Sequence, residues 1–466
     1  MKVTLLGHAS VFIEMTGARA LMDPVFQDPF EDTAVVSCPR RSIALDQIPS
    51  VELLVISHSH LDHFDIPSLA HVAKSSRKCE VLCPKDKAIV YALQKLGFEK
   101  IHPEDSLKHF QFGAYELLTS HSHVDSIVEF GVVFKDRTGT FWNQVDTHIT
   151  PAAAPKTLDA AGPIDLLFAM YASQNFNFFE SRGVGFPHAL HEMNLSTVMA
   201  IRPRMAVPGS AGFRFAGKGM EWCNAFLFPM SRERFVADLA RVAPQIPTRL
   251  ANPGDVFEID GGAVEHRPAA SRMAKMIEDD TEKLRFDPTA TIPPLEDPNP
   301  AGVASESLRR GVDEALDAFA RFVRDACTSA DDAVVEEYRR CNATYAIGVV
   351  FPDGAESWLR VALSRGDPQL ARAEGSIAPA DAGHRIVASA LTAWNAREKS
   401  YFYLRAFSRK WAALYELAER EGHASLQPRE PQDLLAYYLE RKAKGADLAV
   451  KQWLDFQLAP FLKSHG

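Results

Sequence analysis

The chain has 466 residues, 46% of them hydrophobic and 24% charged, and a formal net charge of −9 at pH 7. This length exceeds one ordinary hydrophobic core and favours two domains, while the composition is that of a globular protein. Acidic and basic residues are interspersed without a basic stripe, which argues against nucleic acid as a partner. The sequence has neither an apolar run near the roughly 20 residues that cross a bilayer nor a secretory pattern at its start. We therefore expect a cytoplasmic protein without a membrane span.

The first part of the chain is predicted to alternate strands and helices. Short apolar runs typical of strands stand at 3–6, 10–14, 19–22, 53–56, 116–119, 127–134 and 140–145. Apolar residues recur at helical spacing over 66–74 and 86–96. Strands interleaved with helices indicate a layered α/β architecture with the sheets inside.

A proline-rich stretch marks the predicted domain boundary. Five prolines lie within residues 286–303, which cannot sustain a helix or an inner strand. We therefore divide the chain into a catalytic domain (1–285), a linker (286–303) and an accessory α+β domain (304–466). The accessory domain is predicted to open with a helix over 308–323, followed by a hairpin of residues 345–351 and 358–363. Helical segments are expected around 384–397, 410–421 and 431–444.

A string of metal-ligand residues follows the apolar run at 53–56. It consists of His58, His60, Asp62 and His63. In an extended turn the first two side chains point the same way and can hold one ion, while Asp62 and His63 can reach a second. Imidazole and carboxylate ligands suit zinc, iron or manganese. This pattern predicts a dinuclear metal site.

Two later strand ends carry the remaining candidate ligands. The run at 117–120 leads into His121 and His123, and the run at 141–145 leads into Asp146. We predict that Asp146 bridges the two ions, and that Asp62, His63 and Asp146 act in catalysis. His121 is the predicted third imidazole, with His123 as its alternative. His8 either faces the site or caps a strand.

These motifs resemble the metallo-β-lactamase superfamily. The resemblance rests on residues 7–10 (Gly-His-Ala-Ser), Asp23-Pro24, the HxHxDH string, His121 and residues 145–147 (Val-Asp-Thr). It implies a four-layer αββα sandwich for the catalytic domain. The closest branch holds the UlaG-like lactonases, the phospholipase-D-like hydrolases and the CMP-N-acetylneuraminate hydroxylases. Residues 185–187, 202–213 and 252–255 resemble the hydroxylases in particular, although their Rieske domain has no counterpart here.

One position departs from the pattern of the superfamily's hydrolases. They usually place a last histidine after a strand and a proline, where this chain has Pro208-Gly209-Ser210. Serine is a poor metal ligand, so another residue is expected to replace it. The candidates are His148, His188, His191 and Glu192, and His188 is included in the predicted ligand set.

Two functions compete on this evidence. The resemblance to the hydroxylases and to metallo-β-lactamase-fold diiron monooxygenases, with the missing histidine, favours a diiron monooxygenase. Its cofactors would be two divalent ions, iron favoured over zinc or manganese. An external electron donor is expected, because the chain has no flavin or nicotinamide fingerprint and no cysteine set for an iron–sulfur cluster. The alternative is a zinc or manganese hydrolase of a lactone, ester or phosphodiester. Either would act on a small-molecule substrate, and Phe176, Phe178 and Phe179 either line its pocket or pack in the core.

Overall fold

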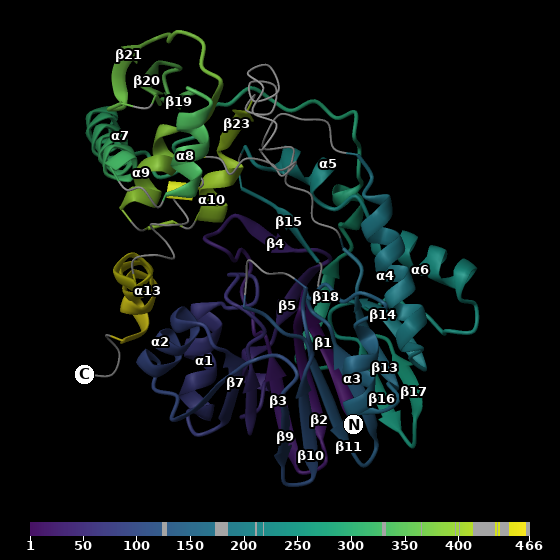
Figure 1. The fold of residues 1–466 in the computed structure, drawn as a ribbon. Coiled ribbons are helices and arrows are strands. Elements are labelled where there is room, and N and C mark those ends of the chain that lie inside the picture. The colour runs from purple at the N-terminus through teal and green to yellow at the C-terminus, as the bar shows by residue number, and fades with distance from the viewer. Residues whose placement is uncertain are drawn as a thin grey trace.

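The computed structural model describes residues 1–123, 128–172, 185–209, 212–217, 219–328, 332–364, 366–396, 398–399, 401–412, 434–435, 437–438 and 447–462. Within these residues two sheets form the first part of the chain (Figure 1). The larger sheet runs in the order β17 (Ala263–Arg267), β16 (Val256–Asp260), β1 (Lys2–Gly7), β2 (Ser10–Met15), β3 (Ala18–Met22), β6 (Leu53–Val55), β7 (Glu80–Pro84), β8 (Lys100–Glu104). The smaller runs in the order β14 (Met205–Gly209), β13 (Leu166–Met170), β12 (Gly139–Asn143), β11 (Val132–Asp136), β10 (Tyr115–Thr119), β9 (His109–Phe112).

Alternating side chains pack the two sheets face to face. In β11, Val132 and Phe134 belong to the core between the sheets, which also contains Val3 and Val55 of the larger sheet. Val133 lies between them in sequence and points to the opposite face, because neighbouring residues of a strand alternate sides. Each sheet therefore has one face in this core and one face left for helices.

Helices cover the two outer faces. Buried residues of α1 (Ile66–Ser76) and α2 (Lys87–Lys95) pack on the larger sheet. Those of α3 (Ala154–Ala161) and α4 (His188–Ile201) pack on the smaller one. The first two helices begin at aspartates: Asp65 accepts a hydrogen bond from the Ser68 backbone N–H, and Asp86 from the Ala88 and Ile89 backbone N–H groups. The layers are helix, sheet, sheet, helix, which confirms the predicted fold class.

Smaller elements connect this sandwich to the rest of the chain. They are the paired strands β4 (Val35–Ser37) and β15 (Phe213–Phe215), the paired strands β5 (Arg40–Ile43) and β18 (Ala274–Glu278), and the helices α5 (Asn224–Leu227) and α6 (Arg232–Val242). None of the helices in the described part of the chain combines the length and apolar content that a membrane crossing requires.

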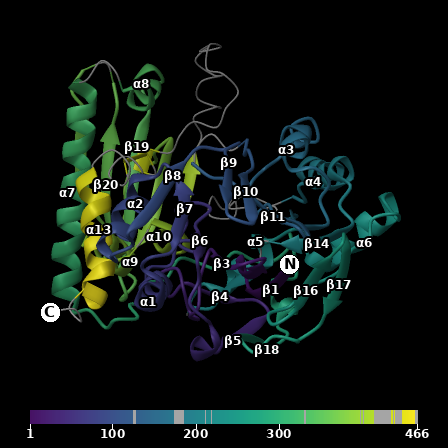
Figure 2. The ribbon, with the colours of Figure 1, turned by 90° about the horizontal axis from the view of Figure 1, so that it is seen from below.

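The C-terminal part forms a second α+β unit. Its sheet runs in the order β21 (Gln369–Glu374), β20 (Glu356–Ala362), β19 (Thr344–Val350), β22 (Ala382–Val387), β23 (Ser408–Ala412). The helices are α7 (Ser305–Thr328), α8 (Ala333–Arg340), α9 (Ala388–Asn395), α10 (Tyr401–Ala406) and α13 (Asp447–Leu462). Seen from below, α7 and α6 lie at opposite sides of the molecule (Figure 2). The predicted opening helix and hairpin are confirmed as α7 and the β19–β20 pair.

The helix predicted over 384–397 is wrong in its first four residues. They belong to β22, which pairs parallel to β19 and antiparallel to β23, and α9 begins only at Ala388. Residues 410–412 are likewise in a strand rather than in a helix. Pairing with strands distant in the sequence decides both cases, and a local pattern does not carry that information. Residues 413–421 lie outside the described part.

The predicted linker contains no helix or strand, and it is anchored. Leu295 and Asp297 are buried, and the Asp297 carboxylate accepts hydrogen bonds from the Ser389 backbone N–H (2.8 Å) and hydroxyl. One apolar cluster contains residues from both sides of it, among them Phe213 and Leu308. The division of the chain into residues 1–285, 286–303 and 304–466 therefore stays a proposal, because the first and the last of these parts share an apolar core.

Candidate metal centre

Strand ends at one edge of the sandwich supply the candidate ligands. β1 and β3 both pair antiparallel to β2, and β6 pairs parallel to β3, so all three end at the same edge of their sheet. His8 follows β1, Asp23 follows β3, and His58 to His63 follow β6. In Figure 1, β1 rises from the N terminus towards β4 and β15, so this edge faces the C-terminal part.

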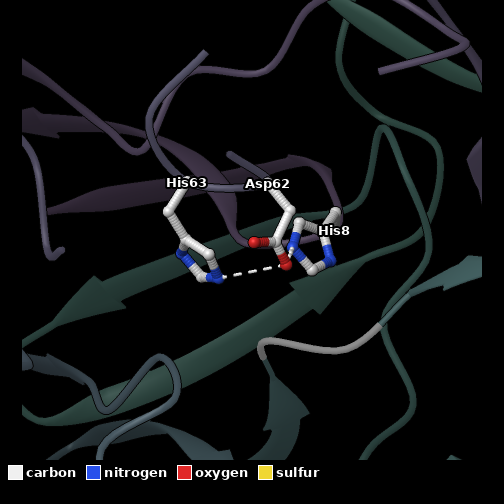
Figure 3. Close-up of side chains that lie close together, drawn as sticks. All are labelled: His8, Asp62 and His63. Carbon is white, nitrogen blue, oxygen red and sulfur yellow. Dashed lines mark hydrogen bonds and ion pairs between the residues drawn. The ribbon is translucent and has the colours of Figure 1, made fainter. Parts of the chain in front are cut away.

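Two groups of described side chains have ligand atoms within 4.8 Å of one another. The first is His8, Asp62 and His63, and the second is His58, His63 and Asp146. Asp62 lies between two imidazoles (Figure 3), with its Oδ2 3.0 Å from His8 Nε2 and 3.6 Å from His63 Nε2. Asp146 Oδ2 is 3.4 Å from His63 Nε2 and 3.9 Å from His58 Nε2. His60 adjoins the second group, because its Nδ1 is 3.0 Å from His58 Nε2.

Asp23 orients the imidazoles of His58 and His63 through hydrogen bonds. Its Oδ2 accepts hydrogen bonds from His63 Nδ1 (2.9 Å) and from the Ser57 hydroxyl (2.6 Å). Since that hydroxyl donates its hydrogen to Asp23, it accepts one from His58 Nδ1 at 2.9 Å. Both histidines are thus held with the proton on Nδ1 and the lone pair on Nε2, which is the arrangement of metal-binding histidines with a carboxylate behind them.

The geometry fits bound cations. His63 Nε2 is buried and has no hydrogen-bond partner, although it faces two carboxylates. A buried polar atom without a partner is costly unless a ligand such as a metal ion satisfies it. The group of His8, Asp62 and His63 can hold an ion, and so can the group of His58, His63 and Asp146, with His60 beside the second group.

The charges within the cluster also favour the binding of a cation. Burial, together with the charges of His63 and His60, lowers the pKa of His58 well below its usual value, so this ring is neutral. Burial opposes a charge on His63, but the carboxylates of Asp62 and Asp146 outweigh it and raise the pKa of His63. Burial also opposes the ionisation of Asp62, yet His63 and the His8 hydrogen bond lower the pKa of Asp62. Asp62 therefore stays ionised and attracts cations.

Two further carboxyl groups lie near enough to the centre to feel its charges, and neither was predicted from the sequence. Glu31 is 8% exposed, and burial and the charge of Asp62 raise its pKa well above the usual value. Glu129 is equally buried, and its pKa rises to about 7 through burial, despite a hydrogen bond from Ser122, with a contribution from Asp146. No local motif marks either residue, since their places depend on how loops from distant strands fold over the site.

The other predicted ligands lie in neither group. His121 has its Nδ1 3.4 Å from the Ser106 hydroxyl and its ring 4.8 Å from that of the exposed His123. His188 is exposed at the start of α4, where its ring packs 4.7 Å from that of Phe186. Their roles as ligands therefore stay predictions without support from this geometry.

The alternatives to His188 are placed as follows. His191 Nε2 pairs with Asp238 at 3.0 Å, Glu192 is exposed, and His148 is half-buried. Ser210 and the predicted pocket residues Phe176, Phe178 and Phe179 lie outside the described residues.

Part of the chain is similar to known proteins. Residues 2–173 match the family model of the β-lactamase superfamily domain. An uncharacterized protein of Mycobacterium tuberculosis is 35% identical over 81 residues, which are 16% of this chain and 22% of that protein. A protein of Mycolicibacterium smegmatis named as a Rieske 2Fe-2S iron–sulfur protein is 28% identical over 186 residues, 37% of this chain and 34% of that protein. The chain thus spans about a fifth and about a third of the lengths of these two relatives.

A solved structure is similar at the level of the fold. The structure of CmlA, a diiron β-hydroxylase from Streptomyces venezuelae, aligns with a TM-score of 0.39 and 16% identity, over 57% of this chain and 54% of that one. The domain match and the histidine–aspartate cluster together indicate a metal-dependent enzyme of the metallo-β-lactamase fold.

Proposed function

We propose that this protein is a dinuclear non-heme iron oxygenase, of the hydroxylase or N-oxygenase type. It would act on a small organic or carrier-linked substrate with dioxygen and an external reductant. The narrower resemblance to the CMP-N-acetylneuraminate hydroxylases belongs to this proposal. So does the assignment of His58, His60, Asp62, His63 and Asp146 as ligands.

The observation that supports the proposal is that four carboxyl groups accompany the four imidazoles of the centre. Asp62 and Asp146 lie among the histidines, and Glu31 and Glu129 are close enough for the charges of the two aspartates to act on them. Oxygen-activating diiron sites in proteins are built mainly from carboxylates with a few histidines. Zinc hydroxide sites of hydrolases rely more on histidine. His121 and His188, which would have enriched the site in imidazole, lie in neither group.

The relative named as a Rieske iron–sulfur protein also supports an oxygenase rather than a hydrolase. Its name implies an electron-transfer cluster, and the match spans more than a third of this chain. A metal centre of this kind would take electrons from an external donor with such a cluster.

The chain's own residues would bind the ions and limit access to them. Two bound iron ions would supply the oxidising chemistry, by activating dioxygen. Asp146 lies 3.4 Å from His63, the residue that the two groups of ligands share, and would keep the ions together. The rings of His58 and His63 have no exposed surface, whereas Asp146 is partly exposed and His60 is exposed. A substrate would therefore approach from the side of His60 and Asp146, and His8 would hold Asp62 in orientation.

The test compares iron-loaded and zinc-loaded protein. We expect about two iron ions per chain from iron-rich medium, visible absorption that bleaches on anaerobic reduction, and its return when oxygen is admitted. Oxygen consumption by the reduced protein should fall in a variant with both His58 and His60 replaced by alanine. Rapid hydrolysis of esters, lactones or phosphodiesters by the zinc form, with no oxygen consumption by the iron form, would establish the hydrolase instead.

A further inference from the structure

A buried arginine joins the two turns that follow β1 and β3. Arg41 lies on β5, and it is only 4% exposed. Its Nη1 donates to the carbonyl groups of Gly7 (2.7 Å) and Leu6 (3.3 Å), and its Nη2 donates to the carbonyl group of Val25 (2.7 Å). One guanidinium group therefore holds the end of β1 against the turn after β3.

The turn after β1 leads directly into His8. The Gly7 carbonyl group that Arg41 binds belongs to the same peptide unit as the His8 backbone N–H. His8 lies beside Asp62 (Figure 3), and its Nε2 is 3.0 Å from the Asp62 carboxylate. A rotation of this peptide unit would therefore move the imidazole away from Asp62.

The turn after β3 carries Asp23, two residues before Val25. The Ser10 hydroxyl donates to the Asp23 carbonyl group (2.7 Å) and accepts from the Val25 backbone N–H (2.9 Å). The Asp23 side chain accepts a hydrogen bond from His63 Nδ1 at 2.9 Å. Arg41 and Ser10 together thus fix the turn from which Asp23 reaches His63.

Both turns have a backbone that needs such support. Gly7, His8 and Asp23 have φ values of +119°, +50° and +46°. Residues with a Cβ keep this conformation only where their surroundings fix them. Arg41 also packs so closely on Gly7 that a Cβ there would lie 2.6 Å from the Arg41 Cδ and 2.8 Å from its Nη1. The glycine therefore lets the guanidinium group reach the backbone.

We propose that Arg41 is a positioning residue of the metal centre. By holding the first turn it would keep His8 directed at Asp62, and by holding the second it would keep Asp23 directed at His63. A guanidinium group suits this role, because its planar fork offers donors in fixed directions to two carbonyl groups at once. This inference rests on the metal-binding part of the proposed function and holds for iron and zinc alike.

The test uses the full chain and measures metal binding rather than turnover. Arg41→Met keeps an unbranched side chain but removes every donor, so we expect the affinity for Zn²⁺ to fall at least tenfold, as for other residues behind metal ligands. The visible absorption bands of the Co²⁺-loaded variant should shift, because reoriented ligands change the geometry around the ion. In Arg41→Lys one nitrogen replaces the two that reach the separate turns, so both changes should be present but smaller.

A matched control separates positioning from a general loss of stability. Arg339 joins two segments of the C-terminal part in a similar manner, since its Nε and Nη1 donate to the carbonyl groups of Ser364 (3.0 Å) and Cys327 (3.2 Å). Arg339→Met should lower the midpoint of urea unfolding, as Arg41→Met does. Unlike Arg41→Met, it should leave the Zn²⁺ affinity and the Co²⁺ spectrum unchanged.

The contrary results separate this inference from the proposed function. A folded Arg41→Met variant with the wild-type Zn²⁺ affinity and Co²⁺ spectrum would show that Arg41 does not position the ligands. If Arg41→Met does not fold, Arg41→Lys decides the question: weakened binding supports the bridge between the two turns, and wild-type binding refutes it. A wild-type chain that binds no metal ion would refute the proposed function, and this inference with it.

Discussion

Asp23 contacts three groups of the candidate metal centre at once. Its carboxylate accepts from the Ser57 backbone N–H (2.7 Å), the Ser57 hydroxyl and His63 Nδ1. In Asp23→Asn the amide group can satisfy only part of this set, so His63 can move its proton to Nε2, where the ion would bind. We expect metal affinity to fall roughly 10- to 100-fold with the fold intact, as for other residues behind metal ligands.

A competition titration with a chromogenic chelator measures this change. Asp136→Asn is a matched control, since Asp136 accepts hydrogen bonds from Thr16 and Thr138 at the end of β11, at the opposite edge of the sandwich. Equal affinities for Asp23→Asn and the wild type would show that Asp23 does not orient the ligands.

Glu129 should make the metal-free protein sensitive to pH. Its pKa is about 7 in the folded chain, compared with 4.5 for a free side chain, because of burial first and Asp146 second. The folded protein then retains a proton that the unfolded chain has lost, so stability decreases as the pH rises from about 4.5 to 7. In Glu129→Gln this contribution disappears. At about 1.4 kcal/mol per pKa unit, the difference amounts to a few kcal/mol.

Urea unfolding at pH 5 and pH 8, with a chelator present, measures the effect. Relative to the wild type, Glu129→Gln should be more stable at pH 8 than at pH 5. Parallel pH dependence of the two proteins would mean that Glu129 ionises normally.

The residues of the centre differ in how readily a sequence motif identifies them. His58, His60, Asp62 and His63 form a compact motif behind an apolar strand, and the structure brings them together. His8, Glu31 and Glu129 belong to separate loops whose neighbours are set by tertiary packing, so no spacing rule points to them. His121 had the same strand-end position as Asp146, but its ring turns towards Ser106 and His123.

At the scale of elements, helix α13 joins the end of the chain to the first layer of the sandwich. Leu454 and Leu458 are buried in the cluster that contains the apolar residues of α1 and α2. Asp455 accepts a hydrogen bond from the Tyr91 hydroxyl at 2.5 Å. We expect Leu458→Ala to destabilise the protein by about 2–5 kcal/mol, through lost burial and the cavity that remains.

Denaturant unfolding tests this, with Leu462→Ala as the control. Leu462 lies on the same helix but is 40% exposed, so its truncation should cost far less. Similar losses in the two variants would mean that α13 does not dock through Leu458.

Local signals explain which elements the sequence could predict. Helices α1 and α2 carry both an aspartate cap and apolar periodicity, and their predicted bounds agree with the structure within two residues. Seven strands of the first part, β1, β2, β3, β6, β10, β11 and β12, are short apolar runs between turn residues and were recognised, whereas others such as β7, β13 and β14 were not. By contrast, β22 contains His384 and Arg385 and becomes a strand through its two neighbours in the sheet. At β22 the local sequence pattern favours a strand less strongly than the pairing with the two neighbouring strands does.

At the scale of the whole molecule, the two parts should remain together after the chain is cut between them. Lys283 and Arg285 are exposed, and residues 287–289 beside them are exposed too, whereas Leu295 and Asp297 are buried. Limited trypsin treatment should therefore cleave after Lys283 or Arg285, near the start of the proposed linker. The fragments should still elute as one species from a size-exclusion column, because one apolar cluster crosses the boundary and α13 packs on α1 and α2.

Denaturing gels and native chromatography of the same digest give the two readouts. Fragments that separate under native conditions would show that the parts are independent domains. The shared apolar cluster would then contribute little to holding them together. Cleavage mainly within residues 1–260 would contradict the proposed boundary itself.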